Sequence, residues 1–388
     1  MSEAIYALFL NLSVTIFLFL SPFSEVWAKI GLILMSVCNS IYFISAFCLK
    51  KEGQAIVTLR TPLNRGLLLF GISAVISIIF SISPYHSQKI FFNRYFLYLL
   101  CFYTGYNYIK SDRDSKFFVF IFLVSGMVLG LGGMIYYFYF HPVRLHFSWY
   151  INVDIATFAL LFLPFVFVYI FHTNKDKLSI KIIAWLSFIF MSVCLLLNYS
   201  RASFISAVLG IFCVLLFNNG VKRRDFIFLG LFAFLFLMLF YEFKSERLLD
   251  PRTWIYRSAY IKEGFALFKS SPFIGRGLGS FELLKFVHPA VTRQALHVEN
   301  LYVEILAQGG LFGLLAFCYL FWLYFKQFTK RIGKLRNYEL AASASIFASL
   351  IYGFLSSTII VGVTMSFIFW FLAGISISRM RLNIDEKG

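Results

Sequence analysis

The chain has few charges, few prolines and no paired cysteine motif. Only 14% of its residues are charged and 60% are hydrophobic, whereas a soluble domain averages roughly 25% charged residues. The six cysteines lie in apolar runs without CxxC spacing, so neither a disulfide framework nor a zinc site is indicated. These shortages exclude a disordered tail, a collagen-like chain, a secreted disulfide scaffold and a soluble cytosolic enzyme.

The chain is rich in long runs of hydrophobic residues. The 388 residues include 51 phenylalanines, and the mean hydropathy is +0.80. A helix that crosses a bilayer needs ~20 apolar residues, and twelve runs are candidates: 4–22, 27–49, 66–82, 95–109, 117–140, 154–172, 182–198, 203–217, 226–243, 301–325, 339–358 and 362–378. We therefore predict an all-α membrane protein with about twelve transmembrane helices, the first a retained helix rather than a cleaved signal.

The net charge of +17 has a topological explanation. If both termini are cytoplasmic, most lysines and arginines fall on cytoplasmic loops, as the positive-inside rule requires. The short outward loops then hold only Lys29, Lys89, Arg94, Arg144 and Arg201. The sequence thus predicts three parts: 1–243 with spans 1–9, 244–300 as a large periplasmic loop, and 301–388 with spans 10–12 and a cytoplasmic tail.

The predicted periplasmic loop contains its own helix. Asp250-Pro251 is typical of a helix start, and apolar residues at Trp254, Ile261 and Phe265 recur at helical spacing up to a stop at Ser271-Pro272. We predict an amphipathic helix over 251–270, lying on the outer membrane interface. The GRGLGS run at 275–280 then predicts a tight turn, and no βα unit surrounds it that would indicate a dinucleotide site.

Isolated arginines are the candidate anion ligands. Arg201, in NYSRAS, follows Ser200 at a predicted helix start, where free backbone N–H groups favour anions. Arg252 and Arg257 lie on the predicted interfacial helix, and arginine binds phosphate oxygens bidentately. The alternative is that Arg201 snorkels to the interface and that the other two attract anionic lipid headgroups.

A second polar group lies where the loop re-enters the membrane. His297, Glu299, Asn300 and Glu304 cluster there, and Asn300, Glu304 and Gln308 would share one stripe of a helix. A carboxylate at this place can cap the helix or pair with an arginine. Two carboxylates, a histidine and an amide opposite isolated arginines also suit a general base beside an anion clamp.

Three segments, in this order, resemble the O-antigen ligase and O-antigen polymerase superfamily. They are NYSRASFISAVLG (198–210), RTWIYRSAYIKEGFALFKSSPFIGRGLGSF (252–281) and HVENLYVEILAQGGLFGL (297–314). The resemblance implies a metal-independent membrane glycosyltransferase without a cofactor. Its expected partners are an undecaprenyl-diphosphate-linked glycan donor, a glycolipid or glycan acceptor and membrane lipid, with no nucleic acid.

The resemblance also implies residue roles. The diphosphate-binding arginines would be Arg201 and Arg252, with Arg257 as a further candidate, and Ser200, Asn300 and Glu304 would support the site. The family's base is a histidine directly before the asparagine, but here Glu299 occupies that position and His297 lies two residues earlier. The base is therefore either Glu299 or His297.

Three functions follow, with the active site of an enzyme at the periplasmic face of a bacterial inner membrane. The first is an O-antigen ligase that transfers the glycan to lipid A core, and the second is a polymerase of the same superfamily. A twelve-span transporter is the remote alternative, because a transporter of that kind predicts an internal repeat and ionisable residues at mid-bilayer, neither of which the sequence shows.

Overall fold

The computed structural model describes residues 3–20, 25–48, 59–140, 155–172, 178–198, 200–217, 223–248, 251–284, 297–331, 335–357 and 363–378. These residues form helices and turns, with no strand among them. The fold class predicted from sequence, all-α, is therefore confirmed for this part of the chain.

Each of the twelve predicted runs contains a helix. The first half of the chain has α1 (Glu3–Leu20), α2 (Glu25–Cys48), α3 (Asn64–Ile79), α4 (Pro84–Ile90), a π-helical turn η1 (Phe91–Tyr95), α5 (Phe96–Tyr108), α6 (Asp112–Phe140), α7 (Ile155–His172) and α8 (Leu178–Asn198). The second half has α9 (Arg201–Phe217), α10 (Arg223–Leu248), α11 (Pro251–Ser270), α12 (Ser280–Leu284), α13 (Leu301–Thr329), α14 (Asn337–Tyr352) and α16 (Val363–Ser378).

The structure gives part of the membrane topology. Within the described ranges, α6, α8 and α13 are both long and apolar enough to cross a membrane. Shorter apolar helices occupy other predicted spans, including those within α1, α3, α7, α9, α10 and α16. The total of twelve spans, the cytoplasmic location of the termini and the division into three parts remain predictions. Helix α10 continues to Leu248, past the predicted end of the ninth span at 243.

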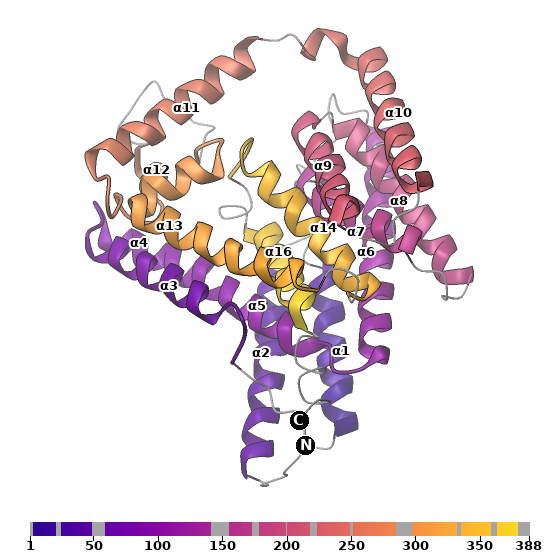
Figure 1. Cartoon of the computed structure of the whole chain (residues 1–388), viewed down its shortest axis with the longest axis horizontal. Coiled ribbons are helices and arrows are strands. Elements are labelled where there is room, and N and C mark those ends of the chain that lie inside the picture. Colours follow the sequence, from indigo (N-terminus) through magenta and orange to yellow (C-terminus); the bar gives the residue numbers. More distant parts are fainter. Residues whose placement is uncertain are drawn as a thin grey trace.

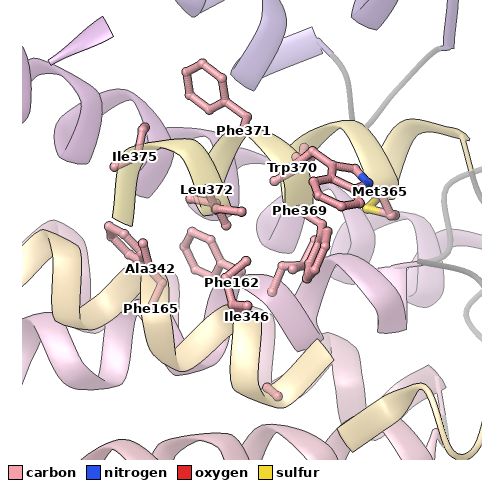
Figure 2. Close-up of a cluster of buried hydrophobic side chains, with 14 of the residues drawn as sticks. Phe162, Phe165, Ala342, Ile346, Met365, Phe369, Trp370, Phe371, Leu372 and Ile375 are labelled. Atoms are coloured by element: carbon pink, nitrogen blue, oxygen red, sulfur yellow. The ribbon is translucent and has the colours of Figure 1, made fainter. Parts of the chain in front are cut away.

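The core lies where α7, α14 and α16 meet. Figure 2 shows Phe162 and Phe165 of α7 beside Ala342 and Ile346 of α14, with Phe369 of α16 among them. Helices gain little hydrophobic free energy from association in lipid, because lipid tails are as apolar as leucine. Close packing of these side chains is therefore the main source of stability here.

Small residues bring other helices close together. A side chain at Gly105 of α5 would overlap the Phe371 carbonyl of α16, and one at Gly374 of α16 would overlap the Phe102 carbonyl of α5. This reciprocal contact is typical of helix pairs in membranes. In Figure 1, α1 and α2 form one end of the molecule and α11 crosses the other, between α10 and the α12–α13 region.

Candidate active site

The candidate site is built around the N-terminus of α13. Asn300 caps this helix: its Oδ1 accepts hydrogen bonds from the backbone N–H groups of Tyr302 and Val303, both at 3.0 Å. Its Nδ2 donates to the Phe354 carbonyl at 2.9 Å, and the Leu301 N–H donates to the Gly353 carbonyl at 2.7 Å. Asn300 therefore fixes the start of α13 against the end of α14.

Glu304 anchors the same segment from inside the helix. Its side chain is 1% exposed, one carboxylate oxygen accepts the Val298 N–H at 2.6 Å, and the other accepts from Gln308 Nε2. The Tyr95 hydroxyl donates to Gln308 Oε1 at 3.1 Å. Glu304 and Gln308 share one stripe of the helix, as predicted, and both oxygens of the Glu304 carboxylate are engaged in hydrogen bonds.

Glu299 lies between these two anchors, at Val298 and Asn300, and His297 lies one residue before the first of them. Val298 is fully buried, whereas His297 and Glu299 on either side are half-buried. The backbone around Glu299 is fixed on one side through Val298 and on the other through Asn300. The backbone of Glu299 is thus fixed on both sides, and the side chains of both candidate bases are partly accessible, so that a substrate hydroxyl can come within hydrogen-bond reach of either.

Helix α11 covers this segment. The predicted range 251–270 and the turn after it are confirmed. Gly264 faces Val298 and Val303, and a Cβ at Gly264 would lie 2.8 Å from Val303 Cγ1. Tyr260 and Leu267 are buried on the same stripe.

The face of α11 differs from the predicted one. Phe265, which the sequence places on the apolar face together with Ile261, is 39% exposed, and the stripe through Tyr260, Gly264 and Leu267 packs against α13 instead. Arg257, three residues before Tyr260, extends this packed stripe and is half-buried. The backbone of Arg252 is in the first turn of α11, but its side chain lies outside the described residues.

Arg201 is at the start of α9, as predicted. Ser200 precedes the helix, and its Oγ accepts the Ser203 N–H at 3.4 Å and donates to Ser203 Oγ at 2.9 Å. Ser200 therefore serves as a helix cap, and Arg201 is half-buried in the first turn. Helix α9 packs along α14, whose C-terminal end holds Asn300, so α14 links the two candidate segments.

The GRGLGS turn fits into a break in α13. The sequence predicts one continuous span over 301–325, but Gly310 interrupts the helix with φ 63° and ψ −162°, a conformation essentially restricted to glycine. Arg276 and Gly277 N–H groups donate to the freed Ala307 and Gln308 carbonyls at 2.9 and 3.1 Å. In return, Leu311 N–H donates to the Pro272 carbonyl at 2.8 Å, so the break leaves these groups paired.

Sequence reasoning missed a polar cluster from the first half of the chain. Arg94 of η1 pairs with Glu282 of α12 at 2.7 Å, and His86 Nε2 lies 3.6 Å from the other oxygen of Glu282. Burial opposes the charge on Arg94, but its acidic neighbours, Glu282 foremost, outweigh burial and raise the pKa of Arg94 above its ordinary value. The only signal was that Arg94 and His86 fall in a predicted outward loop.

Residues 186–318 match the family model described as O-Antigen ligase. This range includes every residue predicted for the site, from Ser200 to Glu304, together with the glycine turn and the break at Gly310. The resemblance found in the sequence is therefore confirmed over this range. No curated protein matches the chain.

Proposed function

We propose, from the premise that this chain carries an O-antigen ligase domain at residues 186–318, that it is an O-antigen ligase-type glycosyltransferase. It would move a glycan from undecaprenyl diphosphate to an acceptor hydroxyl of lipid A core at the periplasmic face. The observation that carries the proposal is the short segment 297–300 before α13, whose backbone is fixed by hydrogen bonds. There, the candidate base Glu299 is held between Val298, bound by Glu304, and the capping residue Asn300, and the second candidate, His297, directly precedes Val298.

The reaction needs one proton transfer and one stable leaving group. The acceptor oxygen forms a bond with the anomeric carbon while the bond from that carbon to the diphosphate oxygen breaks. The base at 299 or 297 takes the hydroxyl proton, and the electron pair leaves with the diphosphate. Arg201 and Arg257, with Arg252, would stabilise the charge of that leaving group, so no metal is required for this step.

The base assignment can be tested by two substitutions. Glu299 directly precedes the capping residue Asn300, so its backbone is the better fixed of the two. We expect Glu299→Gln to reduce the transfer rate by about 10²–10⁴-fold, the usual contribution of a general base, and His297→Ala to reduce it far less. If the order is reversed, the base is His297.

The anion role of Arg201 has its own test. We expect Arg201→Ala to insert into the membrane normally but to lose transfer, by about 10²–10³-fold for one transition-state donor. Arg201→Lys is the control that keeps the charge without the planar fork and should retain intermediate activity. Wild-type turnover by the alanine variant would exclude the clamp role.

The second candidate is a polymerase of the same superfamily. It is favoured by one observation, the glutamate at 299 in place of the family's histidine. A surface-glycan gel from a deletion strain separates the two functions. Loss of all repeats from the core, with long glycan retained on the lipid carrier, indicates a ligase. A core with a single repeat and no ladder indicates a polymerase, and an unchanged gel contradicts both.

A further inference from the structure

The π-helical turn η1 directs two consecutive side chains toward two different helices. The N–H that follows η1 donates to the carbonyl of its first residue, five positions earlier, which is the hydrogen-bond pattern of a π-bulge. Arg94 pairs with Glu282 of α12 at 2.7 Å, and Tyr95 donates to Gln308 of α13. Turns of this kind often lie at functional sites, and η1 is joined here to the helix that begins just after Glu299.

Tyr95 begins a series of hydrogen bonds that ends at the backbone N–H directly before Glu299. Its hydroxyl donates to Gln308 Oε1 at 3.1 Å, and Gln308 Nε2 donates to one oxygen of Glu304. The other Glu304 oxygen accepts the Val298 N–H at 2.6 Å. All three side chains of this series, which we call the Tyr95 network, are buried, so a broken hydrogen bond would leave a buried polar group unpaired, at a cost in free energy.

The first two members of the Tyr95 network are held in place by other contacts. The Tyr95 ring packs against the rings of Phe70 and Tyr98, with centroid distances of 5.8 and 5.9 Å. The backbone carbonyl of Gln308 accepts a hydrogen bond from Ser77 Oγ at 2.6 Å. The hydroxyl of Tyr95 and the amide of Gln308 therefore meet at positions that the surrounding helices determine.

The Tyr95 hydroxyl determines which way the Gln308 amide points. A glutamine amide can present either its oxygen or its NH2 group to a neighbour. Because both Glu304 oxygens accept hydrogen bonds, Gln308 must present its NH2 group to Glu304 and its oxygen to Tyr95. Without the Tyr95 hydroxyl the amide oxygen would lose its donor, so the amide and the carboxylate bound to it would shift. That shift would reach the Val298 N–H.

We propose that Tyr95 is a positioning residue for the transfer reaction. Through Gln308 and Glu304 it fixes the backbone at Val298 and thereby places Glu299 against the acceptor hydroxyl. The inference rests on the proposed function, since it takes Glu299 to be the base. A general base must come within ~2.6–3.2 Å of the oxygen whose proton it takes. A small displacement of Glu299 therefore slows proton transfer, whereas binding of the glycan donor is unaffected.

The first test removes the hydroxyl and keeps the ring. We expect Tyr95→Phe to lower kcat about tenfold, less than the ~10²-fold that a 1 Å misplacement can cost, and to leave KM for the donor unchanged. The matched control is Tyr98→Phe, because Tyr98 is also buried but its hydroxyl is hydrogen-bonded to Ser366 of α16. Both variants should lower the unfolding temperature by a similar amount, since each loses one buried hydrogen bond, and Tyr98→Phe should keep the wild-type kcat.

A double-mutant cycle separates positioning from a general loss of stability. Residues that act as a unit have non-additive effects on the rate, so Tyr95→Phe should lower the residual kcat of Glu299→Gln by less than about twofold. An equal loss from Tyr95→Phe in both backgrounds, or an equal loss from Tyr98→Phe and Tyr95→Phe, would overturn the proposal. Full activity of Glu299→Gln alone would also overturn it, because no base would then stand at 299.

Hydrogen exchange distinguishes failure of this proposal from failure of the proposed function. The exchange rate of the Val298 amide, measured on the full chain in phospholipid nanodiscs, reports how firmly the segment before α13 is held. We expect Tyr95→Phe to increase this rate and Tyr98→Phe to leave it unchanged. An unchanged rate in Tyr95→Phe overturns the proposal. If the wild type transfers no glycan but the rate increases as expected, the proposed function fails and the link from Tyr95 to Val298 is supported.

Discussion

The glycine junction and the aromatic core are held together in different ways. The glycine junction, formed by residues 272–279 and 307–312, consists of backbone hydrogen bonds such as Arg276 N–H to the Ala307 carbonyl at 2.9 Å. The aromatic core between α7, α14 and α16 consists of apolar side chains in contact (Figure 2). The stability of the glycine junction depends on the geometry of each hydrogen bond. The stability of the aromatic core depends on how completely its side chains fill the space between the helices.

The membrane explains why the two regions differ. A broken helix at membrane depth must pair its freed N–H and C=O groups within the protein, since lipid offers no partners. The backbone can supply those partners only where its residues adopt the required φ angles, so the glycine junction should tolerate few substitutions. Apolar side chains can be replaced by others of similar volume at little cost in stability, so the aromatic core should tolerate many.

The largest effect is expected from Gly277→Ala. Gly277 has φ 104°, which a residue with a Cβ adopts only at a cost of ~1–3 kcal/mol, and the new Cβ would overlap the Ser81 side chain. We expect normal insertion, a lower unfolding temperature and almost no transfer. Gly132→Ala is the control, because its Cβ meets open space; equal activity of the two variants would contradict the role of the junction.

The sequence predicts the local parts of this junction but not its assembly. GRGLGS indicates a turn, and the range 251–270 of α11 follows from Pro251 and Ser271-Pro272. The break at Gly310 is not predictable, because the same Gly-hydrophobic pattern suits a continuous span. The pairing of Arg94 with Glu282, which lie 188 residues apart, depends on tertiary packing that periodicity does not contain.

The candidate site shows the same division. The start of α9 at Arg201 was predictable from the local sequence, whereas Asn300, predicted within the helical stripe of Glu304 and Gln308, proves to be the N-cap of α13. The hydrogen bond from the Val298 N–H to Glu304 could not be predicted, because it depends on the backbone conformation of the residues before α13. With Glu304 buried, Glu299 and His297 are the accessible candidates.

An exchange of Glu304 and Gln308 should have an intermediate effect. Gln308→Glu places two carboxylates side by side, and Glu304→Gln forces the Gln308 amide to turn over. Each change disturbs buried hydrogen bonds worth ~1–3 kcal/mol. In the double variant Glu304→Gln/Gln308→Glu, the amide can still accept from Val298 N–H and donate to the new carboxylate, which can accept from Tyr95.

We therefore expect the double variant to be more stable and more active than Gln308→Glu alone, with a coupling energy of ~0.5–3 kcal/mol. Thermal unfolding in detergent and the transfer rate measure it. Losses in the double variant that equal the sum of the two single losses would show that the hydrogen-bonded chain does not act as a unit.

The smallest effect is expected in the aromatic core. Ile346 of α14 is fully buried among Phe162, Leu372 and their neighbours (Figure 2), and Ile346→Val removes one methylene group without introducing a polar atom. The expected cost is ~0.5–1.5 kcal/mol, seen as a small decrease in unfolding temperature, with the transfer rate unchanged. If Ile346→Val instead reduced transfer as strongly as Gly277→Ala, the core would have to control the shape of the site through α14, whose end holds Asn300. An unchanged rate would place the control of activity in the glycine junction and leave the core to stability.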